Sequence, residues 1–262
     1  MQVIICPNEA RVGEVAAAVV AKVVKAVGPG VVLGVATGSS PLSLYENLAA
    51  RVRSGLDVSN AQAYALDEYV GLPETHPESY HAVINRTVTV PLGLDPARVH
   101  VPDGSLDGLA TAGDRYEAAI KAAGGVDIQI LGIGANGHIG FNEPTSSLSS
   151  RTHMVVLTQR TREDNARFFD SIDQVPTAAM TQGLGTILDA RAVVMVAMGE
   201  GKAKAIADTV EGPVTSMVPA SVLQMHRDAT IVVDEAAASQ LKLADYYKQT
   251  YADLPDWAKL DV

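Results

Sequence analysis

Residues 31–52 read VVLGVATGSSPLSLYENLAARV and contain two kinds of structure in sequence. Residues 31–36 form a continuous apolar run, which is typical of a strand that is buried on both faces of a sheet. A short hydroxyl-rich loop follows, and residues 42–52 have a helical pattern, with Pro41 suited to the first turn. This order predicts a strand–loop–helix unit of a parallel sheet.

The same alternation runs through the whole chain. Apolar, mostly β-branched runs occupy residues 3–6, 31–36, 63–66, 126–132, 155–157, 192–197 and 229–233. Helical patterns occupy residues 14–27, 42–52, 109–123, 177–188 and 202–210. Buried strands interleaved with helices predict an α/β fold: a doubly wound, mostly parallel sheet with helices on both faces, a Rossmann-like three-layer sandwich. No internal repeat or low-complexity linker interrupts the pattern, so we expect residues 1–262 to form a single domain.

Composition limits the classes of function. Hydrophobic residues make up 47% of the 262 residues and charged residues 19%, which allows a sizeable core and argues against global disorder. The 30 acidic residues outnumber the 20 basic ones, for a net charge of -10. Such a chain repels a phosphate backbone, so we expect no nucleic-acid partner. A locally basic site for a small anion remains compatible with this charge.

The single cysteine and the apolar segments bear on the cellular setting. One cysteine, Cys6, can form neither an intrachain disulfide nor a cysteine-based zinc site. The first apolar stretch is too short for a signal peptide, and no apolar run is long enough to span a membrane. We therefore expect a reduced, cytoplasmic protein with no membrane partner.

The loops that follow the strands are the expected ligand site, because doubly wound sheets bind ligands outside the carboxyl ends of their strands. The first such loop is Thr37-Gly38-Ser39-Ser40. Its hydroxyls and the N–H groups at the start of the next helix can bind an anion. The alternative is an ordinary cap formed by Ser39 and Ser40. Four successive hydroxyl or glycine positions favour a phosphate loop, although no Gly-Lys-Ser/Thr follows as in a nucleotide P-loop.

Two adjacent carboxylates, Asp67 and Glu68, follow the apolar run at residues 63–66. Neighbouring side chains of an extended segment point to opposite sides, so these two are expected to have different roles. A carboxylate between core and solvent can have a raised pKa and act as a general base. A solvated acidic turn is the alternative.

Residues 130–144, ILGIGANGHIGFNEP, are the most informative stretch. Its glycines match the Gly-x-Gly-x-x-Gly pattern of dinucleotide-binding proteins, but Gly140 and Pro144 would break the helix that this motif requires. A pair formed by His138 and Glu143 explains the stretch better, because a carboxylate can fix the tautomer of an imidazole that titrates near neutral pH. Asn136 could orient either the imidazole or a hydroxyl of a substrate.

These segments together resemble the glucosamine-6-phosphate deaminase family. The strongest matches are ATGSSP at 36–41, LDEY at 66–69 and GHIGFNEP at 137–144. Shorter matches follow in the same order: SSL at 146–148, NARFF at 165–169, VP at 175–176, TIL at 186–188, GKA at 201–203 and LQMH at 223–226. The resemblance extends from residue 3 to about residue 247.

The resemblance implies a reaction and a set of roles. The family converts glucosamine 6-phosphate and water to fructose 6-phosphate and ammonia without a metal or organic cofactor. Asp67 would move a proton from C2 to C1, and His138, supported by Glu143 and Asn136, would open the sugar ring. The phosphate would be held by the side chains and backbone of Thr37, Gly38, Ser39, Ser40, Arg167 and Lys202. A mobile lid is expected around residues 158–188.

Two departures from the family pattern are visible. Many relatives have aspartate at the position of Asn136, and an amide cannot accept the proton. Allosterically regulated relatives bind an effector phosphate between subunits with basic residues at the positions of His153 and Val155. We therefore expect no activation by N-acetylglucosamine 6-phosphate, and the oligomeric state, monomer or homo-oligomer, stays open.

Three alternative functions remain at this stage. 6-Phosphogluconolactonase shares the fold and a phosphate loop but needs no base for a carbon-bound proton, so Asp67 and the segment from His138 to Glu143 favour the deaminase. A galactosamine-6-phosphate deaminase differs only in the configuration of one hydroxyl group of its substrate. A non-catalytic sugar-phosphate sensor would need a DNA-reading appendage, for which the pattern of strands and helices leaves no room.

Overall fold

Seven parallel strands form the centre of the molecule, and the computed structural model describes all residues, 1–262. Their order across the sheet is β1-β10-β9-β6-β2-β3-β5. The strands are β1 (Gln2–Cys6), β2 (Val32–Val35), β3 (Gln62–Ala65), β5 (Val99–His100), β6 (Ile128–Leu131), β9 (Ala192–Ala197) and β10 (Ala229–Asp234). Every neighbouring pair is parallel, as expected for strands connected through helices.

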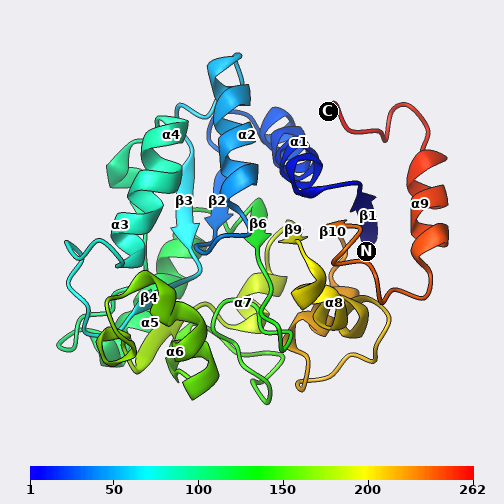
Figure 1. Ribbon diagram of the computed structural model, residues 1–262. Coiled ribbons are helices and arrows are strands. Elements are labelled where there is room, and N and C mark those ends of the chain that lie inside the picture. Colours follow the sequence, from blue (N-terminus) through cyan, green and yellow to red (C-terminus); the bar gives the residue numbers. More distant parts are fainter.

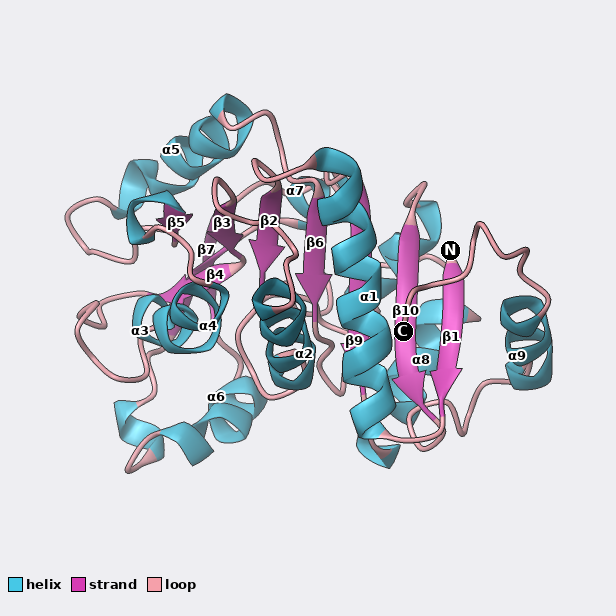
Figure 2. Cartoon of the chain, turned by 90° about the horizontal axis from the view of Figure 1, so that it is seen from above, coloured by secondary structure: helices cyan, strands magenta, loops and turns pink.

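Helices cover both faces of this sheet (Figures 1 and 2). Along β9 the buried side chains alternate, so that Val193 and Met195 belong to one core cluster and Val194 and Val196 to the other. One face packs against α1 (Glu9–Val27), α2 (Leu42–Arg53), α3 (Tyr80–Ile84), the π-helical turn η1 (Asn85–Thr89) and α4 (Val90–Leu92). The other face packs against α5 (Leu109–Ala122), α7 (Leu184–Leu188) and α8 (Ala203–Val210). The predicted three-layer α/β architecture is thus confirmed.

A second, antiparallel sheet of three strands was not predicted. It consists of β4 (Asp67–Tyr69), β8 (Ala178–Thr181) and β7 (His153–Val156), in the order β4-β8-β7. The strand predicted at 155–157 therefore belongs to this sheet and not to the parallel one. The helix predicted at 177–188 is wrong in its first half, because residues 178–181 pair on both sides as β8 and only 184–188 are helical.

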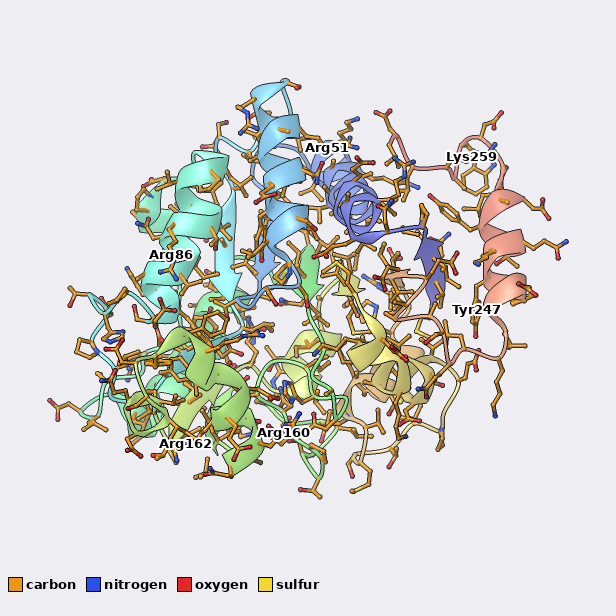
Figure 3. The ribbon with its side chains drawn as sticks, in the orientation of Figure 1. Arg51, Arg86, Arg160, Arg162, Tyr247 and Lys259 are labelled. Atoms are coloured by element: carbon orange, nitrogen blue, oxygen red, sulfur yellow. The ribbon has the colours of Figure 1, made fainter.

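Short helices and a C-terminal segment complete the chain. Helix α9 (Ala244–Ala252) lies beside β1 at the edge of the sheet (Figures 1 and 2), and the guanidinium of Arg51, labelled in Figure 3, donates to the Asp261 carbonyl oxygen at 2.7 Å. No helix combines the length and apolarity needed to cross a membrane. The remaining elements are η2 (Pro96–Arg98), α6 (Gln159–Asn165), η3 (Ala166–Phe168), η4 (Ile172–Gln174), η5 (Glu200–Lys202) and η6 (Pro219–Met225).

The carboxyl ends of the parallel strands all lie at one edge of the sheet. In Figure 2 the arrowheads point toward the end of the molecule at which α6 lies. The segments that follow β2, β3, β6 and β9, four adjacent strands in the sheet, therefore converge beside α6. This is the position at which open α/β sheets bind ligands.

Candidate active site

A cleft of about 230 Å³ opens at this edge of the sheet. It brings together the loop after β2, the start of β4, the loop after β6, α6 with the turn that follows it, and the residue that precedes α8. Eight of the ten predicted site residues line it: Thr37, Gly38, Ser39, Ser40, Asp67, His138, Arg167 and Lys202. The other two, Asn136 and Glu143, do not line the cleft but contact the His138 segment from behind.

The loop after β2 presents free hydroxyls to the cleft. The capping role expected for Ser39 and Ser40 is wrong, because α2 begins after Pro41 and no side chain caps it. The Ser39 carbonyl oxygen only accepts the Leu42 N–H at 3.3 Å. The Ser39 and Ser40 hydroxyls and the N–H groups that follow Leu42 in the first turn of this 12-residue helix are thus available to an anion.

Two cations face the same end of the cleft. The Lys202 ammonium donates to the Ile133 carbonyl oxygen at 2.7 Å and forms no salt bridge, and burial lowers its pKa. Arg167 is exposed, forms no salt bridge, and lies with its guanidinium carbon 4.7 Å from the centre of the Phe168 ring. Cations without carboxylate partners, in a chain of net charge -10, make this end of the cleft suitable for an anionic ligand.

Asp67 and Glu68 have the separate roles that their alternation predicts. Glu68 turns away from the cleft and accepts the N–H groups of Tyr69, Tyr80 and His81 at 2.8–2.9 Å, so it fixes the start of α3. Asp67 lines the cleft and is 6% exposed. Burial, together with the nearby charge of Glu68, raises the pKa of Asp67 well above its usual range. An aspartate in this setting is a good candidate for a general base.

His138 lies against a carboxylate that is itself firmly held. Its Nδ1 is 3.6 Å from Glu143 Oε1, and no closer partner satisfies this nitrogen. Asn136 Nδ2 donates to Glu143 Oε2 at 2.6 Å, and Asn136 Oδ1 accepts the His138 N–H at 3.2 Å. Burial alone would raise the pKa of Glu143, but the nearby His138 imidazole and hydrogen bonds from Thr161 and Asn136 lower it to about 2. Of the two options for Asn136, the amide thus supports the imidazole through Glu143.

Glycines around His138 make room for side chains. A Cβ at Gly134 would lie 2.2 Å from His138 Cε1, so only glycine allows the imidazole to take this position. Gly140 has a φ of 56°, and a Cβ there would lie 2.9 Å from Thr181 Oγ1. Residues 132–152 contain no helix, which excludes the dinucleotide-binding interpretation of this glycine pattern.

Tyr80 and Thr161 are polar residues of the site that were not predicted. Tyr80, at the start of α3, lines the cleft and stacks on Phe141 with ring centres 6.0 Å apart. Thr161 of α6 is 4% exposed, lines the cleft and donates its hydroxyl to Glu143 Oε1. Neither lies directly after a parallel strand, and nothing in their local sequence distinguishes them from ordinary helix residues.

Comparisons with known proteins identify the family that this chain resembles. Residues 7–232 match the model of the family described as glucosamine-6-phosphate isomerases/6-phosphogluconolactonase. The glucosamine-6-phosphate deaminase of Bifidobacterium longum (strain NCC 2705) is 56% identical over 266 residues, covering 98% of each chain. The protein of the same name from Streptomyces coelicolor is 56% identical over 259 residues, covering 98% of this chain and 99% of its own.

Solved structures give the same picture. A structure described as a monomeric glucosamine-6-phosphate deaminase superposes with a TM-score of 0.88 at 40% identity and covers 92% of this chain and 100% of its own. The 6-phosphogluconolactonase of Trypanosoma cruzi has a TM-score of 0.75 at 18% identity, over 92% of this chain and 97% of its own. The second likeness shows a shared fold only.

Proposed function

This chain belongs to the family of glucosamine-6-phosphate isomerases and 6-phosphogluconolactonases, and we propose that it is a glucosamine-6-phosphate deaminase with its active site in the cleft beside α6. The observation that carries the proposal is one cleft that joins an anion-binding end to a buried base and a carboxylate-supported histidine. Relatives of that name at 56% identity support the assignment. The reaction converts glucosamine 6-phosphate and water to fructose 6-phosphate and ammonia.

The phosphate group binds at the loop from Thr37 to Ser40, with Lys202 and Arg167. The hydroxyls, the N–H groups at the start of α2 and the two cations supply hydrogen bonds and charge. The phosphate is remote from the bonds that change, so its binding energy places the sugar against the acid–base groups.

His138 opens the sugar ring. Its Nδ1 faces Glu143, which leaves Nε2 for the substrate. The imidazole accepts the proton of the C1 hydroxyl and returns a proton to the ring oxygen, so the bond from C1 to that oxygen breaks and the open-chain aldehyde forms. A group that both accepts and donates a proton near neutral pH suits this step. Glu143 and Asn136 keep the imidazole oriented.

Asp67 carries out the isomerisation. Its carboxylate takes the proton from C2 and delivers it to C1, while a proton of the substrate's ammonium group passes to the C1 carbonyl oxygen. C1 becomes a CH2OH group, and C2 is left as an iminium carbon. Water adds to that carbon and ammonia leaves, so that C2 becomes the ketone of fructose 6-phosphate. Burial without a hydrogen-bond donor makes this carboxylate a stronger base than an exposed aspartate.

We narrow the expected lid to the first half of residues 158–188. Met180, Leu184 and Ile187 are buried, and β8 pairs on both sides, which fixes the second half in the core. Residues 158–174 form short helices at the mouth of the cleft and are the part that can move.

The buried, unpaired Cys6 suits a reducing compartment such as the cytoplasm.

One assay distinguishes the candidate activities. The purified protein is incubated separately with glucosamine 6-phosphate, galactosamine 6-phosphate and 6-phosphogluconolactone, with readouts for ammonia, ketose phosphate and lactone hydrolysis. We expect ammonia and fructose 6-phosphate in equal amounts from the gluco substrate. Faster turnover of the galacto epimer would change the substrate assignment. Lactone hydrolysis without ammonia release from either amino sugar would contradict the proposal.

A further inference from the structure

The Glu143 carboxylate is held from two different parts of the chain. Its Oε2 accepts a hydrogen bond of 2.6 Å from Asn136 in its own loop. Its Oε1 accepts the hydroxyl of Thr161, a buried residue of α6. That same Oε1 is the atom that faces His138 Nδ1 at 3.6 Å. The oxygen that supports the imidazole is therefore positioned by a side chain outside the histidine loop.

The segment that carries Thr161 also reaches the anion-binding end of the cleft. Asp164 and Asn165 at the end of α6 and Arg167 in the next turn line the cleft. Arg162, labelled on α6 in Figure 3, holds this segment together by donating to the carbonyl oxygens of Ile172 at 2.9 Å and Val175 at 3.2 Å. The phosphate-binding cation and the Glu143 contact thus lie within one short stretch that is braced as a unit.

We propose that Thr161 is a positioning residue that fixes the Glu143 carboxylate toward His138 and so couples ring opening to the segment that binds the phosphate. The inference rests on the function proposed above. Glu143 Oε1 is 3.6 Å from Nδ1, slightly beyond hydrogen-bond distance, and Nδ1 has no other partner. A small rotation of the carboxylate therefore decides whether the imidazole is supported. The Thr161 hydroxyl limits that rotation, and its own place depends on α6.

The test uses threonine variants that differ in one group. Thr161→Val removes the hydroxyl with little change of shape, and Thr161→Ser keeps it. Thr158 Oγ1 lies 3.0 Å from Thr161 Oγ1, so a Thr158 variant would disturb the same hydroxyl. The control is therefore Gln159→Ala, which removes the exposed contact of Gln159 with Glu163 at 3.1 Å in the same helix and leaves the Thr161 hydroxyl on Glu143. Each variant is assayed for kcat and KM with glucosamine 6-phosphate. Affinity is measured for 2-amino-2-deoxyglucitol 6-phosphate, an open-chain analogue that needs no ring opening.

We expect Thr161→Val to lower kcat on the order of tenfold, as for loss of one hydrogen bond to a charged group, with the affinity for the analogue nearly unchanged. Thr161→Ser should restore kcat. Gln159→Ala should keep most of kcat, because the contact that it removes lies on the exposed side of α6. In a Glu143→Gln background, Thr161→Val should cost little more, because the two residues act through one contact.

Several results would overturn the inference. These are an unchanged kcat in Thr161→Val, an equal loss of kcat in Gln159→Ala, or a full additional loss in the Glu143→Gln background. If Thr161→Val does not fold, Thr161→Ala, which lacks the second branch, takes its place with the same expectations. A wild-type protein that releases no ammonia would instead contradict the proposed function, so the two failures are distinguishable.

Discussion

Two carboxylates serve the cleft, Asp67 in its lining and Glu143 behind His138, and their surroundings differ in kind. Asp67, at the start of the three-stranded sheet, is buried beside Glu68, and its pKa is raised well above the usual range. Glu143, in the loop after β6, is partly buried too, yet the nearby His138 imidazole and hydrogen bonds from Thr161 and Asn136 bring its pKa down to about 2. Burial acts in the same direction on both, so the donors decide the outcome.

This difference separates a base from a fixed anion. A buried carboxylate that accepts no hydrogen bond is stabilised when it takes up a proton. This property suits the residue that must remove a proton from carbon. A carboxylate with several donors stays ionised and keeps its orientation, which suits the partner of a histidine. The following predictions test this contrast, from the largest expected effect to the smallest.

Replacing the base should have the largest effect. We expect Asp67→Asn to lower the isomerisation rate by roughly a hundredfold to ten-thousandfold, because a positioned general base is lost. Binding of the open-chain analogue should remain nearly intact, since the anion-binding end of the cleft is unchanged. Exchange of the C2 proton in deuterated water measures the step directly. Exchange at the wild-type rate in this variant would rule out Asp67 as the base.

The two carboxylates should also have opposite effects on stability. The folded-state pKa of Glu143 is lowered to about 2. Its contribution to the free energy of unfolding is therefore fully present above the unfolded-state pKa and is lost as the pH falls through the folded-state pKa. Its side chain is 13% exposed, and the shift corresponds to about 3 kcal/mol. In Glu143→Gln the loss of stability between about pH 4.5 and pH 2 should therefore be smaller than in the wild type.

For Asp67 the dependence of stability on pH has the opposite sign. Its folded-state pKa is raised, so the folded protein binds the proton more tightly and stability falls as the pH rises from the unfolded value toward the folded one. Asp67→Asn removes this term and should be more stable than the wild type at neutral pH. Urea unfolding of both variants across pH gives the two slopes. Parallel pH profiles for the wild type and the variants would contradict the assigned pKa directions.

Removing a cation from the phosphate-binding end of the cleft should weaken substrate binding more than it lowers kcat. Each charge-assisted contact is worth roughly 1.5–3 kcal/mol. We expect the larger loss of affinity for Lys202→Ala, because the ammonium is partly buried, and the smaller loss for Arg167→Ala, because its guanidinium is exposed to solvent and salt. Lys204 on the next turn pairs with Asp208 at 2.6 Å and does not line the cleft, so Lys204→Ala is a matched control. Unchanged analogue affinity in both cleft variants would place the phosphate elsewhere.

The parallel sheet could be predicted from the sequence because its strands are buried on both faces. Such strands are continuous apolar runs, and their carboxyl ends share one edge, which is enough to bring Thr37, Asp67 and His138 together. The three-stranded sheet had no comparable signal. Strand β8 reads Ala-Ala-Met-Thr, which has helical propensity, and only its pairing with β4 and β7 makes it extended.

The site could be predicted from the sequence only in the part that follows the parallel strands. Residues in loops after the parallel strands could be found from position and chemistry, and the family resemblance singled out Arg167 and Lys202. Thr161 and Tyr80 enter the cleft from α6 and α3, which the pattern did not place. Their roles depend on how these helices pack against the sheet, and no local sequence pattern encodes that packing.

The smallest expected effect is that of an effector. We expect hyperbolic saturation with glucosamine 6-phosphate and no activation by N-acetylglucosamine 6-phosphate at neutral pH. Val155 packs against the cluster of Tyr69, Phe141 and Leu157 and has no charge, and the ring Nδ1 of His153 contacts the Arg151 carbonyl oxygen at 2.7 Å. The neighbouring guanidinium of Arg151 is already paired with Glu117 and Asp189. No free cation of this strand is left for a second phosphate, and an effector can shift an equilibrium only by binding two states differently.

Steady-state kinetics with and without the effector measure this directly. A Hill coefficient well above one that the effector abolishes would show that other residues form a regulatory site.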